Sequence, residues 1–207
     1  NMLNKKLLEF SKQIKALADA GMVFKNSEYD AERYEQLQEI ALEMQSLLST
    51  KEVAVFKDFY LPVEDYPTPN VDVRAFIING KKEVLLVREQ VDGRWTLPGG
   101  WADIGLSPKE NVIKELEEET GYTVEVKRLL AVFDKKMHDH PPQPHYVYKM
   151  CFLCEITGQE SKPNFDITGM DWFSLQALPE LSKDRILKSQ LELLFEHLDA
   201  SKPVYFD

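Results

Sequence analysis

Apolar residues recur every three or four positions along the first fifty residues of the chain. One run comprises Leu3, Leu7, Phe10, Ile14 and Leu17, and a second comprises Tyr34, Leu37, Ala41, Met44 and Leu48. This period places the apolar side chains on one face of an α-helix. Ser27 lies before the second run, and serine is a favoured N-cap residue. We therefore expect an antiparallel helical hairpin over residues 1–50, with a core too small to fold alone, so that it docks on the rest of the chain or on a second copy.

A different pattern follows residues 51–70, which carry Pro62, Pro67 and Pro69 and are expected to form a linker. Beyond this segment, apolar and polar residues alternate as they do in β-strands. Strands are predicted near residues 71–77, 84–87, 123–134, 145–157 and 170–173, with Asn79-Gly80 as a hairpin turn between the first two. Helices are predicted over residues 108–120 and 184–198. Mixed strands around one central helix indicate an α+β sandwich over residues 71–207.

The overall charge of the chain limits its partners. Acidic residues outnumber basic residues 35 to 25, and the formal net charge is −10. Such a chain has no basic field with which to hold a nucleic-acid backbone, so a phosphate-bearing substrate would need a local cation. No apolar run reaches ten residues, which excludes a membrane-spanning helix. The first residues also lack the apolar stretch of a signal peptide, so we expect a cytoplasmic protein.

Cys151 and Cys154 form a Cys-x-x-Cys sequence. Such a pair can be half of a zinc site or a redox pair. The sequence holds no second pair of cysteines, and residues three apart in a strand point to opposite faces of the sheet. Two buried core thiols are therefore the favoured interpretation.

The predicted helix over residues 108–120 has both ends marked in the sequence. Ser107 is a natural N-cap, Pro108 suits the first helical turn, and Glu110 stands where a capping box requires it. Gly121 is the expected C-terminal stop. The boundaries of this helix are therefore predicted by local chemistry alone.

Four glutamates crowd the last turns of this helix, where the helix dipole is negative: Glu115, Glu117, Glu118 and Glu119. At about 100° per residue, Glu115, Glu118 and Glu119 share one sector, while Glu117 points away. A divalent cation with oxygen ligands, such as Mg²⁺ or Mn²⁺, would compensate their charge. The alternative is a solvated acidic face, which we disfavour because the acidic sector borders the apolar stripe of the helix.

The segment from Gly100 to Tyr122 resembles the Nudix box, G-x5-E-x7-R-E-U-x-E-E-x-G-U, in which U is a bulky aliphatic residue. The three glutamates of the acidic sector match this pattern, whereas Leu106 and Lys114 stand where it has Glu and Arg. Tyr122 stands in place of the last aliphatic residue. Since the Glu and the Arg typically interact in the family, their joint replacement looks like the exchange of a structural pair.

Segments on both sides of the box extend the resemblance to about residues 70–200. Trp95-Thr96-Leu97-Pro98 resembles the usual entry to the box, and Asp171-Trp172-Phe173 resembles a late strand of the family. The resemblance implies a Nudix-like α/β/α sandwich with a mixed sheet. A helical hairpin ahead of such a domain is similar to a bacterial subgroup that includes CDP-choline and ADP-ribose pyrophosphatases.

The activity that the resemblance implies is hydrolysis of the diphosphate linkage in a nucleoside diphosphate derivative, with release of a nucleoside monophosphate. Mg²⁺ or Mn²⁺ would be held by Glu115, Glu118 and Glu119 and by the backbone carbonyl of Gly99. Glu115 and Glu118 are the expected catalytic residues, with Glu115 the first choice as general base. Loop-side alternatives for the base are Glu155, Glu160 and Asp166.

The expected substrate-binding residues are Arg74, Arg88, Trp101 and His145. The arginines could hold phosphates as planar donors, although surface pairing is equally plausible for Arg88. Trp95 and Trp101 could stack a base or belong to the core. The insertion that carries His138, Asp139, His140 and His145 could be a substrate lid, a metal site or a solvated loop. Asp103 is either an acid behind the metal ligands or a turn residue.

Two other functions are consistent with the sequence. A non-catalytic nucleotide sensor would account for Leu106, Lys114 and the added hairpin. An RNA-end hydrolase or exonuclease is the other alternative, although the acidic charge disfavours tracking along extended RNA and allows only a short RNA end. The hairpin further predicts a homodimer.

Overall fold

The computed structural model describes residues 2–49, 66–103, 105–159 and 166–207, so most of the expected linker at 51–70 lies outside the described residues. The contacts divide the chain into two compact units. The first comprises residues 1–69 with 142–145, and the second comprises residues 70–141 with 146–207. The extents expected for the domains, 1–50 and 71–207, stay predictions, and each unit is described by itself.

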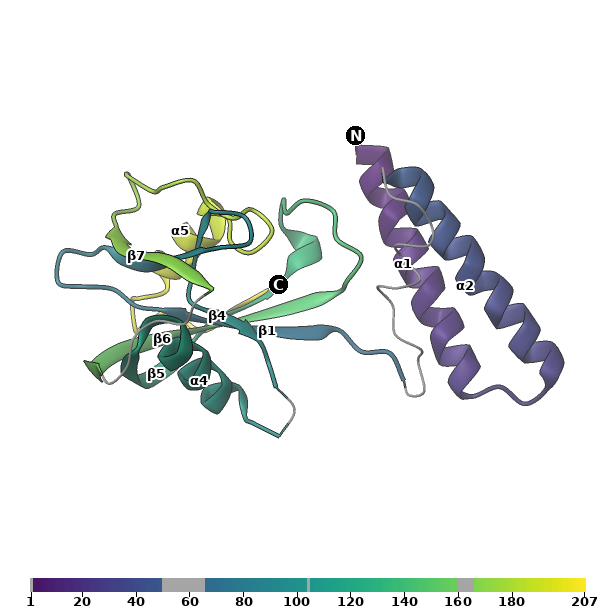
Figure 1. Cartoon of the computed structure of the whole chain (residues 1–207), viewed down its shortest axis with the longest axis horizontal. Helices are drawn as coiled ribbons and strands as arrows, with labels where there is room; N and C mark the ends of the chain where they lie inside the picture. The colour runs from purple at the N-terminus through teal and green to yellow at the C-terminus, as the bar shows by residue number, and fades with distance from the viewer. Residues whose placement is uncertain (1, 50–65, 104, 160–165) are drawn as a thin grey trace. The chain divides into compact units, whose positions relative to one another are not determined.

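The first unit contains the predicted helical hairpin. Helices α1 (Met2–Val23) and α2 (Glu28–Leu48) run side by side (Figure 1). Ser27 is the N-cap of α2, and its side chain accepts a hydrogen bond of 3.1 Å from the Asp30 amide. A side chain at Gly21 would come within 2.3 Å of the Tyr34 ring, so the absence of one lets the two helices approach closely.

The apolar run of α1 is only partly buried, since Leu7 and Ile14 are half-buried and its other three residues are exposed. Leu3, Phe10 and Leu17 are 60%, 45% and 72% exposed. The buried positions of α1 are instead mostly polar: Ser11, Lys12, Lys15, Ala18 and Asp19. They are compatible with burial because they pair: Lys15 Nζ lies 2.7 Å from Asp19, and Gln38 of α2 donates to Asp19 at 2.7 Å.

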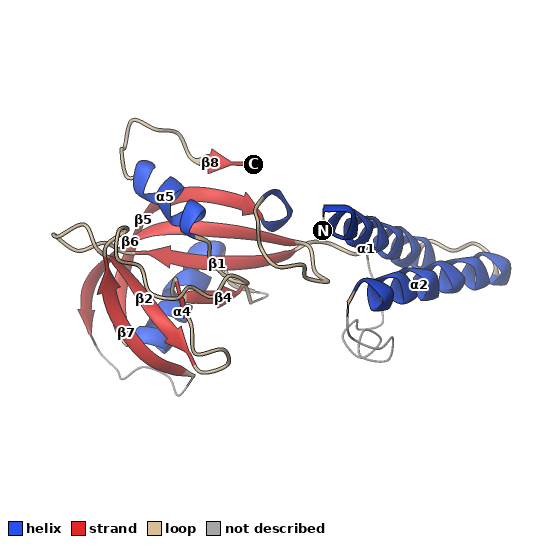
Figure 2. Ribbon diagram, turned by 90° about the horizontal axis from the view of Figure 1, so that it is seen from above, coloured by secondary structure: helices blue, strands red, loops and turns tan. Residues whose placement is uncertain are grey.

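The second unit is an α+β sandwich built on two sheets, as predicted (Figure 2). The larger is a mixed sheet in the order β4-β1-β6-β5-β8, and the smaller is antiparallel in the order β3-β2-β7. The strands are β1 (Asn70–Phe76), β2 (Val84–Glu89), β3 (Trp95–Thr96), β4 (Gly99–Trp101), β5 (Tyr122–Asp134), β6 (Val147–Gln159), β7 (Ile167–Phe173) and β8 (Tyr205–Phe206). A short 3₁₀ helix, η1 (Lys135–Met137), follows β5.

Two apolar clusters cover opposite faces of the large sheet. Helix α4 (Pro108–Thr120) contributes Val112 and Leu116 to one cluster, and α5 (Lys188–Glu196) contributes Leu191 and Leu194 to the other. Cys151 belongs to the α5 side and Cys154 to the α4 side. Both thiols are buried and free, which confirms the structural interpretation of this pair.

The segments that flank Asn79-Gly80 form the predicted hairpin turn, but the strands then belong to different sheets. Next to the turn, the Asn79 amide donates to the Glu83 carbonyl and the Leu85 amide donates to the Ile77 carbonyl, both at 3.0 Å. Away from the turn, β1 belongs to the large sheet and β2 to the small one. In this turn, Lys82 has a left-handed backbone conformation with φ of 60°, whereas Gly80 does not have a positive φ. The sequence pattern predicts the turn but not this separation, because β1 and β2 are both buried on two faces, so apolar runs do not show which strands pair.

The last helix is shorter than its predicted range of 184–198. Residues before it form a turn in which the amides of Arg185 and Ile186 both donate to the Ser182 carbonyl. None of the helices in the described residues has the length and apolar character needed to cross a membrane.

His140, in the segment between η1 and β6, is almost completely buried. Its side chain is 7% exposed, and its Nδ1 donates to the Lys183 carbonyl at 2.7 Å. Burial disfavours the imidazolium form and lowers the pKa of His140 to about 4 from an ordinary 6.5, outweighing the hydrogen bond. The unfolded chain therefore binds more protons than the folded chain between these two pH values, and stability contributed by His140 is complete above pH 6.5 and is lost as the pH falls towards 4.

We predict that H140Q makes the unfolding free energy of this unit less dependent on pH. Between pH 7.5 and pH 5.5, the wild type should lose about 1 kcal/mol more than the variant. Urea unfolding followed by tryptophan fluorescence measures this unit alone, because Trp95, Trp101 and Trp172 all lie in it. As a control, I186V removes one buried methylene and should keep the wild-type difference between the two pH values. Equal pH dependence of H140Q and wild type would contradict the prediction.

Candidate active site

Helix α4 is fixed at both ends by its own sequence. Ser107 and Glu110 form the predicted capping box, in which the Ser107 side chain accepts from the Glu110 amide and the Glu110 carboxylate accepts from the Ser107 amide at 2.7 Å. Gly121 ends the helix in the left-handed conformation, with φ of 73°. The position of every carboxylate along the helix follows from these two ends.

Strand β4 brings two glycines against the end of α4. Gly99 has φ of 130°, and a Cβ there would lie 2.1 Å from the Val73 carbonyl oxygen, so only glycine fits. Its amide donates to Glu119 Oε2 at 2.7 Å. A Cβ at Gly100 would lie 2.6 Å from Glu115 Oε2. Glu115 and Glu119 are therefore brought together against the Gly99-Gly100 backbone, as the sequence led us to expect of this sector.

Glu118, the third glutamate of the sector, is turned toward Lys114. Its Oε2 lies 3.1 Å from Lys114 Nζ, and its side chain is 51% exposed. The same ammonium lies 3.7 Å from Glu115 Oε1 and 3.2 Å from Asp103 Oδ2. Lys114 thus occupies the centre of a group of three carboxylates.

The donor set suits a hard divalent cation, but its present side-chain arrangement does not surround one. Glutamate oxygens beside a backbone carbonyl are the ligands that Mg²⁺ and Mn²⁺ prefer. In the described part of the chain, no three Asp, Glu, His or Cys side chains form a group that could hold an ion. The residues that would hold it are Glu115, Glu118, Glu119 and the Gly99 carbonyl, after Glu118 has turned away from Lys114.

Burial is the largest cause of the pKa shifts of Glu115 and Glu119, the two glutamates beside the Gly99-Gly100 backbone. It raises the pKa of Glu119 to about 8, against the opposing effects of Arg74 and the Gly99 amide. Burial also raises the pKa of Glu115, with Lys114 opposing and Glu118 adding to the rise. Both carboxyls therefore lie where negative charge is costly, and a cation bound beside them would favour their ionised forms.

Arg74 lies in a buried ionic cluster on the face of β1 opposite to α4. Its Nε donates to Asp72 at 2.8 Å and its Nη1 donates to the Leu97 carbonyl at 2.9 Å. Lys149 of β6 also pairs with Asp72. Burial works against the charge of Arg74, but Asp72, Glu119 and Glu89 outweigh it and raise the pKa of Arg74. The expected phosphate contact of Arg74 stays a prediction, and at 6% exposure its shown role is to place positive charge near Glu119.

The other expected substrate residues belong to different elements of the chain. Arg88 is exposed and donates to the Gly93 carbonyl at 2.7 Å, which stabilises the turn after β2. Trp101 ends β4 and is 53% exposed. His145 belongs to the first unit, with the hairpin. Trp95 packs edge-on against Phe173 at 4.8 Å and so lies in the core.

The structure describes two of the three loop-side candidates for the general base, Glu155 and Asp166, and neither forms an ion pair or side-chain hydrogen bond with the glutamates of α4. Glu155 lies on β6 rather than on a loop and pairs with Lys127 at 2.8 Å. Asp166 is exposed in the turn before β7. Glu160 lies outside the described residues. Of the insertion residues, His138 pairs with Asp207 at 3.0 Å, and Asp139 is exposed.

Sequence reasoning missed the role of Lys114 and of the loop that carries Asp103. The i to i+4 spacing of Lys114 and Glu118 is a readable signal for their ion pair. Nothing in the spacing indicates that Asp103 reaches the same ammonium, because this depends on the path of the loop.

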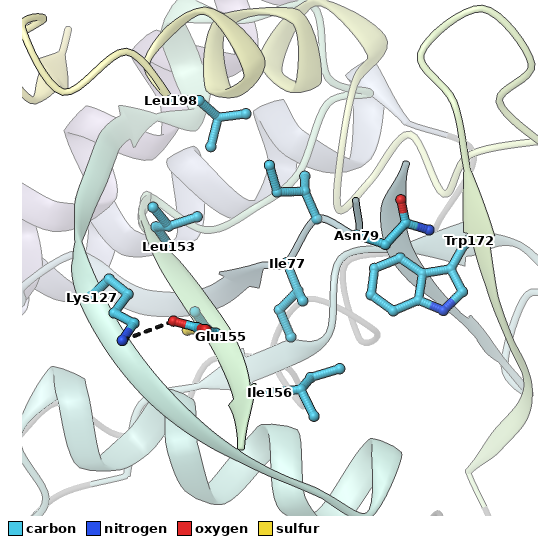
Figure 3. A pocket seen from close by; sticks show the side chains of 10 residues that line it. Ile77, Asn79, Lys127, Leu153, Glu155, Ile156, Trp172 and Leu198 are labelled. Atoms are coloured by element: carbon cyan, nitrogen blue, oxygen red, sulfur yellow. Dashed lines mark ion pairs between the residues drawn. The ribbon is translucent and has the colours of Figure 1, made fainter. Parts of the chain in front are cut away.

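A pocket of about 580 Å³ lies elsewhere in this unit (Figure 3). Its walls are mainly apolar and include Ile77, Leu153, Ile156 and Trp172, and the Lys127–Glu155 ion pair lies on one side. None of the four residues proposed as metal ligands lines it. The glutamate site is therefore separate from this pocket.

Comparison with known proteins identifies both parts of the chain. A model described as the NUDIX domain matches residues 68–194, and a model described as a UDP-X-like, N-terminal oligomerisation domain matches residues 5–60. A Bacillus subtilis (strain 168) protein named "Putative ADP-ribose pyrophosphatase YjhB" is 42% identical over 203 residues, which cover 98% of this chain and 97% of that protein.

Two solved structures are also similar. A crystal structure of UDP-X diphosphatase has a TM-score of 0.65 at 35% identity and covers 99% of both chains. An ADP-ribose pyrophosphatase from Streptococcus suis 89-1591 has a TM-score of 0.60 at 39% identity, covering 68% of this chain and all of that one. With the box glutamates placed against the β4 glycines inside the matched range, the chain belongs to the Nudix hydrolase family.

Proposed function

We propose that this enzyme hydrolyses the diphosphate linkage of nucleoside diphosphate derivatives of the ADP-ribose type, using Mg²⁺ or Mn²⁺, and releases a nucleoside monophosphate. The observation that carries the proposal is the convergence of Glu115 and Glu119 on the Gly99-Gly100 backbone within a Nudix domain. The names of the similar proteins, ADP-ribose pyrophosphatase and UDP-X diphosphatase, support a nucleoside diphosphate joined to a second group. CDP-choline belongs to the same chemical class and stays among the candidates.

Each residue of the site has a separate role in this proposal. Glu115, Glu118 and Glu119 hold the cation together with the Gly99 carbonyl, and Glu115 takes the proton of the attacking water. The bound cation supplies charge neutralisation at the diphosphate and a more acidic water. Arg74 favours the ionised form of Glu119 by charge and so opposes burial, which raises the pKa of this carboxyl.

A second proposal concerns the hairpin, which we infer to form a homodimer contact. The exposed residues of α1, Leu3, Phe10 and Leu17, lie on one helical stripe and leave an apolar surface in a single chain. The match to an N-terminal oligomerisation domain supports this use of the surface. A second copy of the same stripe offers a self-complementary partner, as a two-fold interface requires.

The substrate class is tested with a panel of ADP-ribose, UDP-sugars, CDP-choline and a 5′-labelled short RNA, with Mg²⁺ or Mn²⁺. We expect cleavage of the nucleoside diphosphate derivatives into a nucleoside monophosphate and a phosphorylated second product, identified by mass. Binding without turnover across the panel would instead favour the nucleotide sensor. Cleavage of the RNA alone would favour the RNA-end hydrolase, for which the comparisons provide no support.

We predict that E115Q and E119Q each lower kcat by about 10²–10³-fold, because each removes a charge that holds the cation in the transition state. The matched control is E117Q, which changes an exposed glutamate on the same helix and should keep activity within about two-fold. Steady-state kinetics with the best substrate of the panel, together with circular dichroism of each variant, provide the measurement. Activity of E119Q close to that of E117Q would refute the assignment.

The homodimer is tested with L17E, which places a charge in the exposed apolar stripe of α1. Light scattering should give twice the chain mass for the wild type and the mass of a single chain for L17E, since a buried unpaired carboxylate costs several kcal/mol in an interface. E32Q, on an exposed position of α2, is the control and should remain dimeric. A wild type that is monomeric at micromolar concentration rules out this role of the hairpin.

A further inference from the structure

Lys114 is a cation placed among the carboxylates of the glutamate site. Its ammonium lies 3.1 Å from Glu118, 3.7 Å from Glu115 and 3.2 Å from Asp103. Glu115 and Glu118 are two of the proposed metal ligands, whereas Asp103 is not. The lysine is therefore shared between the metal site and a carboxylate outside it.

The backbone of Asp103 is held in place by the side chain of Asn111 on helix α4. The Asp103 amide donates to Asn111 Oδ1 at 2.8 Å, and Asn111 Nδ2 donates to the carbonyls of Asp103, Leu106 and Ser107 at 3.2–3.3 Å. Asn111 is 1% exposed and lies in the first turn of α4. One buried amide side chain thus fixes the Asp103 backbone relative to the helix that carries the glutamates.

Lys114 itself keeps freedom to move. Its side chain is 39% exposed, and lysine has a long flexible stem with a single charged end. An ammonium with three donors can leave two carboxylates while it keeps the third. Asp103 is the partner it can keep, because Glu115 and Glu118 would be taken by a bound cation.

We propose that Lys114 is the resident counter-ion of the glutamate site, which neutralises Glu115 and Glu118 until a divalent cation binds and then rests on Asp103 alone. This rests on the proposed function, since it requires that the glutamates bind a divalent cation. Lys114 and Asp103 are positioning residues in this scheme. It accounts for the orientation of Glu118, whose carboxylate is turned to Lys114 at 3.1 Å.

The proposal gives the two residues opposite effects on metal affinity. Removal of the ammonium removes a positive charge that competes with the cation, so K114M should bind Mn²⁺ more tightly by about five-fold at low ionic strength. Removal of the Asp103 charge leaves the ammonium with no partner outside the metal site, so D103N should bind Mn²⁺ several-fold more weakly. When D103N is combined with K114M, its effect on Mn²⁺ affinity should largely disappear, because the double variant has no ammonium that needs Asp103 as a partner.

The test is a titration of the full-length protein with Mn²⁺, with free Mn²⁺ measured by electron paramagnetic resonance and no substrate present. The four proteins of the cycle are the wild type, K114M, D103N and the double variant, and thermal unfolding without metal checks that each is folded. The matched control is K127M, because Lys127 is also shared by two carboxylates, Glu125 and Glu155, and is 37% exposed. K127M should bind Mn²⁺ like the wild type.

The outcomes separate this inference from the proposed function. A wild type that binds no Mn²⁺ overturns the metal site itself. If the wild type binds Mn²⁺ but K114M binds it equally or more weakly, the lysine is a support for the ligands and the counter-ion role is wrong. An effect of D103N that is the same with and without Lys114 shows a direct charge effect of Asp103 and also overturns the proposal.

Discussion

The close approach of strand β4 to the last turn of α4 is the constraint on which the site depends. Gly99 lies so near to the Val73 carbonyl that no side chain fits, and Gly100 leaves the space that the Glu115 carboxylate fills. The Gly99 amide can then reach Glu119 at 2.7 Å. A side chain at either position would move the strand or the carboxylate, so the glycines determine the geometry of the glutamates as much as the helix does.

The charges around the glutamates are balanced by two cations of different kinds. Arg74 is locked, because Asp72 and the Leu97 carbonyl hold its guanidinium in the sheet. Lys114 is partly exposed, and three carboxylates share its ammonium. A locked cation can only set the ionisation of Glu119, whereas a mobile cation can exchange places with an ion from solution. The positive charge near Glu119 is therefore fixed in place, whereas the positive charge near Glu115 and Glu118 can move with Lys114.

Local chemistry predicted those parts of the fold that depend on neighbours in sequence. The ends of α4 follow from Ser107, Glu110 and Gly121, and the structure has the helix at the predicted residues. The pairing of β1 with β6 and β4 was not predictable, because strands buried on both faces carry no information about their neighbours. In the site, the helical period predicts that Glu115, Glu118 and Glu119 share one side of α4. The contact between Asp103 and Lys114 was not predictable, because it depends on the path of a loop held by Asn111.

The helical hairpin also shows what a periodic sequence pattern cannot predict. The helical period of α1 predicts an apolar stripe, and the structure leaves three of its five residues exposed. Periodicity shows which side chains share a face, and it does not show what covers that face. Within one chain, α1 instead buries Lys15 and Asp19, which satisfy each other and Gln38. The buried positions of α1 are mostly polar, and Leu3, Phe10 and Leu17 stay exposed in a single chain, which is consistent with the interface proposed for them.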